Sequence, residues 1–283
     1  MFCMRTILVC LFAMLTFGSC KKKDDAGAAK TMLKVKYGTD VRQAMDIYLP
    51  ANRNTATTPV LILIHGGGWT EGSRSDLNAV VDTLQRRMPD YAICNISYRL
   101  AANGQNIFPA QENDVKAAVE FIFNKQTEYG ISNHFALLGA SAGAHLALLH
   151  TYKYSSPVKI KAVVSFFGPT ELVQMYNNPP NPLIPLLLAG VTGGTPTSNS
   201  AIYQQSSPYN FVVAGASPTL LLHGSNDVVV AASQSSILHD KLNSVSVPNQ
   251  YVLYPGAGHG DWTSAVYTDA FLKVETFIKQ YNP

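Results

Sequence analysis

The sequence predicts an α/β fold whose mostly parallel central sheet is covered by helices on both faces. Short apolar segments alternate with longer segments of helical periodicity, which is typical of repeated strand–helix–strand units. Some short segments, such as Val60–Ile64, are apolar without interruption, which indicates strands buried on both faces. Hydrophobic residues make up 47% of the 283 residues, enough for one large core, and no repeat or change of composition divides residues 32–283. We therefore expect one domain over that range.

Eight segments have the apolar, β-branched or aromatic composition of strands. The second of them ends at Pro50, which cannot donate a hydrogen bond to a neighbouring strand. In chain order, strands are expected at Leu33–Tyr37, Ala44–Leu49, Val60–Ile64, Tyr91–Ser97, Phe135–Leu138, Ile160–Phe167, Thr219–Leu222 and Tyr251–Tyr254.

Helices are expected between these strands and at the C-terminus. In Ser73–Arg87 and Glu112–Thr127, apolar residues recur at helical spacing on one face. Further helices are expected at Ala142–Tyr152, in a segment ending with Ile237–Leu242, and at Thr263–Tyr281.

The segment from Glu171 to Val213 differs in composition from the rest of the domain. It contains the proline-rich run NPPNPLIP and the polar run GGTPTSNS. Loops this long are uncommon in a compact domain unless they form a lid or an insertion. We expect a short apolar helix over Leu183–Val191, and we interpret residues 171–213 as a cap-like insertion over a binding site. Additional core is the alternative.

The N-terminus has the pattern of a secretory signal. Arg5 precedes an apolar run from Thr6 to Phe17 that is too short to span a bilayer but suits the apolar region of a signal peptide. We expect residues 1–19 to be this signal, which would export the protein. One outcome is ordinary cleavage near Gly18, which would give a soluble secreted or periplasmic protein. The other is a lipid anchor.

Residues Phe17–Cys20 (FGSC) resemble a bacterial lipobox, whose cysteine is lipidated, although Phe17 stands where that pattern prefers Leu. A lipidated Cys20 would anchor the protein to a membrane at its periplasmic or cell-surface face, with residues 20–31 as a polar tether. Cys94 would then be alone in the mature chain, so it could form no internal disulfide, and its apolar surroundings indicate a core residue.

Gly139-Ala140-Ser141-Ala142-Gly143 matches G-x-S-x-G, in which a serine on a sharp strand-to-helix turn projects its hydroxyl above the sheet. This motif alone is weak evidence, because a pattern with only three fixed residues also occurs by chance in unrelated sequences. Here it follows an expected strand and opens an expected helix, which is the context that the motif requires. Ser141 is therefore the candidate nucleophile.

A second motif, His65-Gly66-Gly67-Gly68-Trp69, follows the strand Val60–Ile64. Three glycines allow backbone N–H groups to point into a site, where they can stabilise a negatively charged oxygen. A phosphate-binding loop would require a following Lys-Ser/Thr or a G-x-G-x-x-G pattern, and neither is present. We expect an oxyanion hole, with His65 bracing its loop.

A nucleophilic serine requires a base, and the base requires an orienting carboxylate. Asp227 follows an apolar strand in PTLLLHGSND, at the carboxyl end where open α/β sheets gather their active sites. If the base follows the acid in the chain, His239 and His259 remain. His239 lies in a helical pattern, whereas His259 lies in the glycine-rich loop GAGHG. Asp261 is the rival acid, but it is poorly placed to brace a histidine two residues away.

Other classes of site are not indicated. No pair of histidines has convincing metal-ligand spacing, so we expect no metal and no cofactor. With 21 basic and 18 acidic side chains the net charge is +3, without the concentrated basic face of a nucleic-acid binder.

HGGGW, GASAG, HGSND and GAGHG, in this order and spacing, resemble the α/β-hydrolase superfamily. Within it they are similar to the HGGG-type esterase/lipase branch, including hormone-sensitive-lipase-like esterases and Bacteroidetes feruloyl or acetyl esterases. MDIYLP, NISYRL, FPAQENDVKAAVEFI and FFGPTEL extend the likeness over nearly all of residues 32–283. The resemblance implies an α/β-hydrolase fold with Ser141 as nucleophile, His259 as base and Asp227 as acid. It further implies Trp69 as a candidate pocket residue, and backbone oxyanion donors at Gly67, Gly68 and Ala142.

Together these expectations describe a serine carboxylic-ester hydrolase that forms an acyl-enzyme and acts outside the cytoplasm. Its substrates would be short acyl esters or acylated carbohydrate fragments. A lipase, an arylformamidase-type amidase and a catalytically silent binding protein of hydrolase fold are the alternatives. No oligomeric state follows from the sequence.

Overall fold

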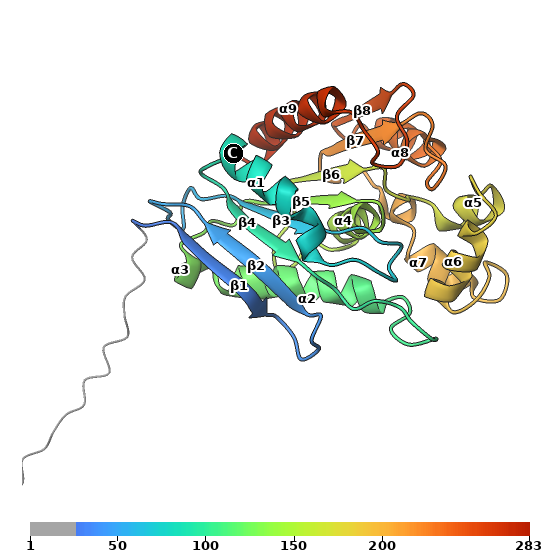
Figure 1. The fold of residues 1–283 in the computed structure, drawn as a ribbon, viewed down its shortest axis with the longest axis horizontal. Coiled ribbons are helices and arrows are strands. Elements are labelled where there is room, and N and C mark those ends of the chain that lie inside the picture. Colours follow the sequence, from blue (N-terminus) through green and yellow to red (C-terminus); the bar gives the residue numbers. More distant parts are fainter. Residues whose placement is uncertain (1–26) are drawn as a thin grey trace, which may run out of the picture.

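The computed structural model describes residues 27–283, which form an α/β fold on one eight-stranded sheet (Figure 1). The strand order is β1-β2-β4-β3-β5-β6-β7-β8. Only the pairs β1–β2 and β2–β4 are antiparallel among the strands of this sheet, so the predicted mostly parallel sheet is confirmed. The strands are β1 (Lys30–Lys36), β2 (Ala44–Leu49), β3 (Val60–Ile64), β4 (Ala92–Ile96), β5 (Phe135–Ala140), β6 (Ala162–Phe166), β7 (Thr219–Gly224) and β8 (Asn249–Tyr254).

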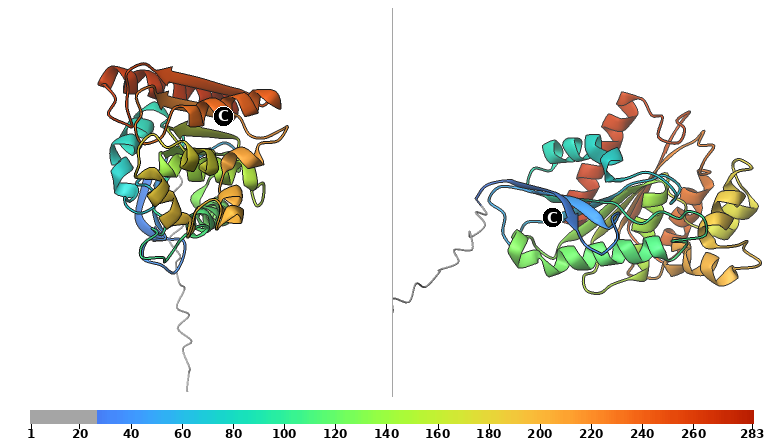
Figure 2. Two further views of the ribbon diagram at one scale, coloured as in Figure 1. Left: turned by 90° about the vertical axis from the view of Figure 1, so that its right-hand side faces the viewer. Right: turned by 60° about the horizontal axis from the view of Figure 1, so that its bottom comes forward.

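Helices cover both faces of the sheet, as predicted, and the side chains of β3 explain how. Leu61 and Leu63 point into the core under α1 and α9, whereas Ile62 points into the core under α2, α4 and α8. Figure 2 shows α1 and α9 on one side of the sheet and α2 on the other. Each of these fully buried aliphatic side chains stabilises the fold by about 1.5–3 kcal/mol. The helices on the two faces are α1 (Asn78–Arg87), α2 (Ala110–Asn124), α3 (Gln126–Tyr129), α4 (Ala142–Lys153), α8 (Ser233–Ser244) and α9 (Ser264–Tyr281).

The helix expected over Ser73–Arg87 is divided. It begins with a 3-10 turn, η1 (Arg74–Leu77), and continues as α1. The backbone N–H of Ser73 donates to the Asp76 carboxylate at 2.9 Å, which caps the turn from within.

Residues 171–213 contain three short α-helices where one was expected: α5 (Leu172–Asn177), α6 (Ile184–Thr192) and α7 (Ser200–Gln205), followed by the 3-10 turn η2 (Pro208–Phe211). The side chain of Glu171 accepts hydrogen bonds from the N–H groups of Val173 and Gln174 and so starts α5. The three helices gather at the right-hand edge of Figure 1, beyond the carboxyl ends of the parallel strands. Leu172 and Leu188 are fully buried, so the segment also adds to the core.

The expected signal peptide over residues 1–19, Cys20 and residues 20–26 of the expected tether lie outside the described residues. Within residues 27–283, none of the helices is both long and apolar enough to cross a membrane. Cys94 is fully buried in β4, and burial raises the pKa of its thiol to about 12, so the thiol is uncharged and unreactive at neutral pH.

Candidate active site

Ser141 lies on the sharp turn between β5 and α4, at the carboxyl edge of the sheet. Its backbone has φ 55° and ψ −122°, a conformation that costs a non-glycine residue about 1–3 kcal/mol. The turn is fixed from both sides, because the Ser141 N–H donates to the carbonyl of Phe166 at 2.9 Å and the Ser141 carbonyl accepts from the His145 N–H at 3.0 Å. The neighbouring structure therefore holds the hydroxyl above the sheet.

The two glycines of the motif are required by close approach. A Cβ atom on Gly143 would lie 2.1 Å from the carbonyl oxygen of Ile64 on β3. A Cβ atom on Gly139 would lie 2.2 Å from the carbonyl oxygen of Gly143. Only glycine at both positions lets α4 begin this close to the sheet.

Three side chains from different loops meet at this turn. The Ser141 Oγ lies 2.9 Å from Nε2 of His259, and Nδ1 of His259 lies 2.7 Å from Oδ2 of Asp227. Because an ionised carboxylate only accepts, Nδ1 carries the proton and Nε2 is left to accept the hydroxyl proton of Ser141. The structure thus brings together the three residues singled out from the sequence. Asp261, the rival acid, is exposed and makes no hydrogen bond to His259 in the described part of the chain.

Both oxygens of the Asp227 carboxylate have hydrogen-bonding partners. Its Oδ1 accepts hydrogen bonds from the backbone N–H groups of Val229 and Val230, both at 2.8 Å. Its Oδ2 faces a second imidazole, with Nε2 of the buried His223 at 3.3 Å. Burial alone would raise the pKa of Asp227, but the hydrogen bonds from His223, His259 and the Val230 N–H outweigh it and lower the pKa. The group is therefore ionised at neutral pH.

The glycine loop after β3 flanks Ser141 on one side. Gly67 has φ +100° and Gly68 has φ +55°, and a Cβ atom on Gly67 would lie 2.3 Å from the carbonyl oxygen of Glu71. Over residues 27–283, neither the Gly67 nor the Gly68 N–H donates to a protein acceptor. Ala142 is the first residue of α4, whose first N–H groups have no partner within the helix. These three amides can therefore stabilise negative charge on a bound oxygen.

Ser141 and His259 line a cavity of about 420 Å³. Its walls come from the glycine loop, from Phe167 after β6, and from α5 and α6, which contribute Met175, Ile184 and Leu187. Glu71 and Asp76 add two carboxylates at the exposed mouth. Helices α5 and α6 therefore form part of the cavity wall as well as part of the core.

Comparison with known proteins identifies the family of the chain. The family model of BD-FAE matches residues 45–242, which include the glycine loop, Ser141 and Asp227. The chain belongs to the BD-FAE family. This BD-FAE chain is 29% identical to esterase LipC of Mycobacterium tuberculosis over 241 residues, which cover 80% of the chain and 59% of LipC. It spans between 48% and 59% of the length of its first three curated relatives.

Solved structures share the fold. A bifunctional GH43-CE protein of Bacteroides eggerthii superposes with a TM-score of 0.79 at 24% identity, covering 89% of this chain and 35% of that one. A truncated carbohydrate esterase from gut microbiota superposes with a TM-score of 0.73 at 24% identity, covering 89% of this chain and 98% of that one. These likenesses confirm the α/β-hydrolase architecture of the BD-FAE domain.

His65 of the BD-FAE chain braces the glycine loop. Its ring stacks on Tyr98 with centroids 4.3 Å apart, and its Nδ1 lies 2.7 Å from the carbonyl oxygen of Gly66. The Tyr98 hydroxyl donates to the carbonyls of His65 and Gly66 at 3.0 and 3.2 Å. Burial lowers the pKa of His65 to about 4, so the ring is neutral at physiological pH.

Trp69 lines the cavity but is only 1% exposed. Its indole N–H points to Nδ1 of His145 at 3.3 Å, and the other ring nitrogen of His145 lies 2.6 Å from the Ser206 carbonyl. Trp69 therefore acts mainly as a fixed wall that joins the glycine loop to α4.

Three residues of the site were not singled out from the sequence: Phe167, His223 and Leu187. Phe167 lies with its ring 4.6 Å from that of His259, and His223 contacts Asp227 from below. Phe167 is the last residue of the strand predicted over Ile160–Phe167, at the carboxyl edge of the sheet, and His223 stands in the HGSND motif, so both had a usable positional signal. Leu187 lies in the helix expected over Leu183–Val191 within the cap-like insertion, so its region was indicated, but which of its leucines faces the cavity depends on the tertiary fold.

Within residues 27–283, no group of three or more His, Cys, Asp or Glu side chains could hold a metal ion.

Proposed function

We propose that this protein is a serine carboxylic-ester hydrolase that works through an acyl-enzyme, with Ser141 as nucleophile, His259 as base and Asp227 as orienting acid. The observation that supports this most strongly is the chain of contacts from the Ser141 Oγ to His259 at 2.9 Å and from His259 to Asp227 at 2.7 Å. Membership of the BD-FAE family and the similarity to the esterase LipC support the same reaction class.

In the first half of the reaction, Ser141 Oγ attacks the ester carbonyl carbon as its proton passes to Nε2 of His259. The carbonyl oxygen becomes an oxyanion, which the amides of Gly67, Gly68 and Ala142 stabilise; one such donor is typically worth about 3–4 kcal/mol. When the tetrahedral intermediate collapses, the alcohol oxygen leaves and takes the proton from His259. The acyl group stays on Ser141.

In the second half, a water molecule attacks the acyl-enzyme and gives a proton to Nε2 of His259. Collapse of the second intermediate releases the carboxylic acid and returns the proton to Ser141 Oγ. The ionised Asp227 stabilises the imidazolium that forms in each half and keeps the proton on Nδ1.

For the substrate, we propose short acyl esters or acylated carbohydrate fragments. A cavity of about 420 Å³ suits a small acyl group with part of its alcohol. Glu71 and Asp76 at the mouth offer carboxylate acceptors for the hydroxyl groups of a sugar. The carbohydrate esterase from gut microbiota that shares this fold, as its name says, acts on esters of carbohydrates, which supports the second of these substrate classes.

A panel of p-nitrophenyl esters of increasing chain length, acetylated xylan fragments and an aryl formamide tests this assignment. We expect the highest kcat/KM on short acyl or acylated-sugar esters. Preference for long chains would indicate a lipase, and preference for the formamide would indicate an amidase.

Ser141→Ala should lower kcat by a factor on the order of 10⁴ or more with the fold intact, because it removes the attacking oxygen. A fluorophosphonate should label the wild type at Ser141 and leave the variant unlabelled. Ester hydrolysis at the wild-type rate by Ser141→Ala would refute the mechanism, and a wild type that neither hydrolyses nor labels would indicate a silent binding protein.

We further propose that the protein is exported and anchored through a lipidated Cys20. The pattern of residues 1–20 carries this proposal. Mass spectrometry of the N-terminus isolated from the native host tests it: a diacylated Cys20 supports the anchor, and an unmodified N-terminus near Gly18 refutes it.

A further inference from the structure

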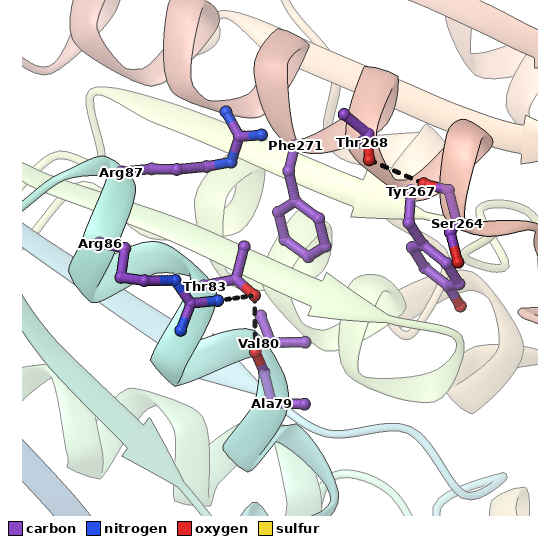
Figure 3. Close-up of a pocket in the computed structure, with 9 residues that line it drawn as sticks. All are labelled: Ala79, Val80, Thr83, Arg86, Arg87, Ser264, Tyr267, Thr268 and Phe271. Carbon is purple, nitrogen blue, oxygen red and sulfur yellow. Dashed lines mark hydrogen bonds between the residues drawn. The ribbon is translucent and has the colours of Figure 1, made fainter.

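A second cavity, of about 580 Å³, lies between α1 and α9 and is larger than the catalytic one. Figure 3 shows the Phe271 ring pointing from α9 into the space above α1, with Arg87 on one side and Tyr267 on the other. Phe271 and the half-buried Val80 give this groove an apolar floor. None of the residues that line it belongs to the catalytic cavity.

One end of the groove is positively charged. Arg86 and Arg87 line that end, and the Lys279 Nζ donates to the Arg87 carbonyl at 3.3 Å. Among the described residues, Glu275 is the one carboxylate that pairs with any of these three cations. Glu275 is shared between Arg87 at 3.1 Å and Lys279 at 2.7 Å. Arg86 has no carboxylate partner over residues 27–283, and its guanidinium contacts only the Thr83 hydroxyl, at 3.3 Å.

The other acids of the two helices face away from the groove. Asp82 of α1 does not line the groove and acts instead on Tyr48 of β2, whose pKa is raised by burial and then by Asp46 and Asp82. Asp269 of α9 accepts from the Tyr254 hydroxyl at 2.8 Å and pairs with Lys273. The positive charge at Arg86 is therefore not neutralised from either helix.

Three hydroxyl groups that line the groove donate their protons within the protein. The Thr83 hydroxyl donates to the Ala79 carbonyl and the Thr268 hydroxyl donates to the Ser264 carbonyl, both at 2.8 Å. The Tyr267 hydroxyl donates to the Gly260 carbonyl at 2.6 Å. Besides the Ser264 hydroxyl near Tyr267, the guanidinium groups are then the donors that the groove offers to a ligand. Because they carry the positive charge, the groove favours an anionic acceptor beside its apolar floor.

We propose that this groove binds an organic carboxylate with an apolar or aromatic body, its carboxylate on Arg86 and its body on Phe271 and Val80. An arginine fork pairs with a carboxylate through two parallel hydrogen bonds, and the apolar floor excludes water from the rest of the ligand. The choice of carboxylate rests on the proposed function, because ester hydrolysis releases a carboxylic acid. An acyl group with an apolar or aromatic body would give an acid of this kind, and the groove would be a second site for that product.

Isothermal titration of the full chain with benzoate tests the proposal, with neutral benzamide and with hydroxylated glucuronate as comparison probes. We expect benzoate to bind at least tenfold more tightly than either. Arg86→Gln should weaken benzoate binding at least tenfold, whereas Lys161→Gln, which removes an exposed cation away from the groove, should not change it.

The apolar floor is tested separately by filling the groove. Ala79 is exposed and lines it, so Ala79→Trp should abolish benzoate binding. Gln85→Trp, on the same helix but outside the lining, is the matched control. Hydrolysis of p-nitrophenyl acetate should be unchanged in all four variants, which separates this groove from the catalytic cavity.

Equal binding of benzoate and benzamide, tighter binding of glucuronate than of benzoate, or benzoate binding that survives Arg86→Gln would overturn the proposal. Arg86-dependent benzoate binding by a chain that hydrolyses no ester would refute the proposed function and leave the carboxylate site standing.

Discussion

Replacement of Asp227 by Asn tests the catalytic geometry with a change of one atom. Oδ1 accepts from two backbone N–H groups at 2.8 Å, so an amide NH₂ cannot occupy that side without facing two donors. The NH₂ must therefore take the place of Oδ2 and point at Nδ1 of His259. His259 can receive that hydrogen bond only with its proton on Nε2, the atom that faces Ser141.

In this tautomer His259 cannot accept the proton of Ser141. Loss of the correct tautomer in a serine triad costs about 10⁴ in kcat, equivalent to about 5 kcal/mol of activation free energy. We expect Asp227→Asn to show this loss in kcat on p-nitrophenyl acetate at pH 8, with little change in KM. Thermal unfolding of the variant verifies that the fold is kept.

Asp261→Asn is the matched control, because it makes the same change in the rival acid two residues from His259. We expect it to keep kcat within about threefold of the wild type. If Asp227→Asn kept kcat within tenfold, or if Asp261→Asn lost more than Asp227→Asn, the reasoning from these contacts would be wrong.

Three further predictions concern packing, pocket shape and pH. Gly143→Ala should lower the free energy of unfolding by about 3 kcal/mol, because the new Cβ atom would meet the Ile64 carbonyl. Gly190→Ala in α6 places its Cβ atom in open space and should raise the free energy of unfolding by about 0.5–1 kcal/mol. Urea denaturation measures both changes. Leu187→Ala should raise the ratio of octanoate to acetate ester hydrolysis roughly tenfold, whereas Leu186→Ala, on the same helix but 74% exposed and outside the cavity, should leave that ratio unchanged. Burial lowers the pKa to about 4 in three histidines, His65, His145 and His150. As pH drops from about 6.5 towards 4, the unfolded chain therefore binds protons that the folded chain excludes, and the free energy of unfolding should fall by up to about 3 kcal/mol per histidine. Guanidinium denaturation at pH 7, 5.5 and 4.5 should show this decrease, and a flat profile would contradict it.

The sheet and the long helices could be predicted because the burial of each element produces a local pattern of apolar residues in the sequence. Val60–Ile64 is apolar at every position since it is buried on both faces, and α2 carries one apolar stripe. The meeting of Ser141, Asp227 and His259 could be anticipated because parallel strands end at one edge, so residues just beyond different strands converge there.

Elements that depend on contacts between distant segments could not be predicted. α5 and α7 are six residues long, too short to show a helical period, and α5 starts on a Glu171 cap rather than on a common capping residue. The place of Leu187 in the cavity depends on how α6 folds back over the glycine loop, where it would lie 3.3 Å from a Cβ atom on Gly68. The residues that shape the cavity are for this reason less predictable than those that perform the chemistry.

The direction of β1 decides which way the cavity faces relative to the start of the domain. β1 is antiparallel to β2, and β2 is antiparallel to β4, so Lys30 lies at the amino edge of the parallel strands while Ser141 lies at the carboxyl edge. In Figure 1 the start of β1 and helices α5–α7 lie at opposite ends of the parallel strands, at the left and at the right of the view. If residues ahead of Lys30 attach the protein to a surface, as proposed for Cys20, the cavity therefore opens away from that surface.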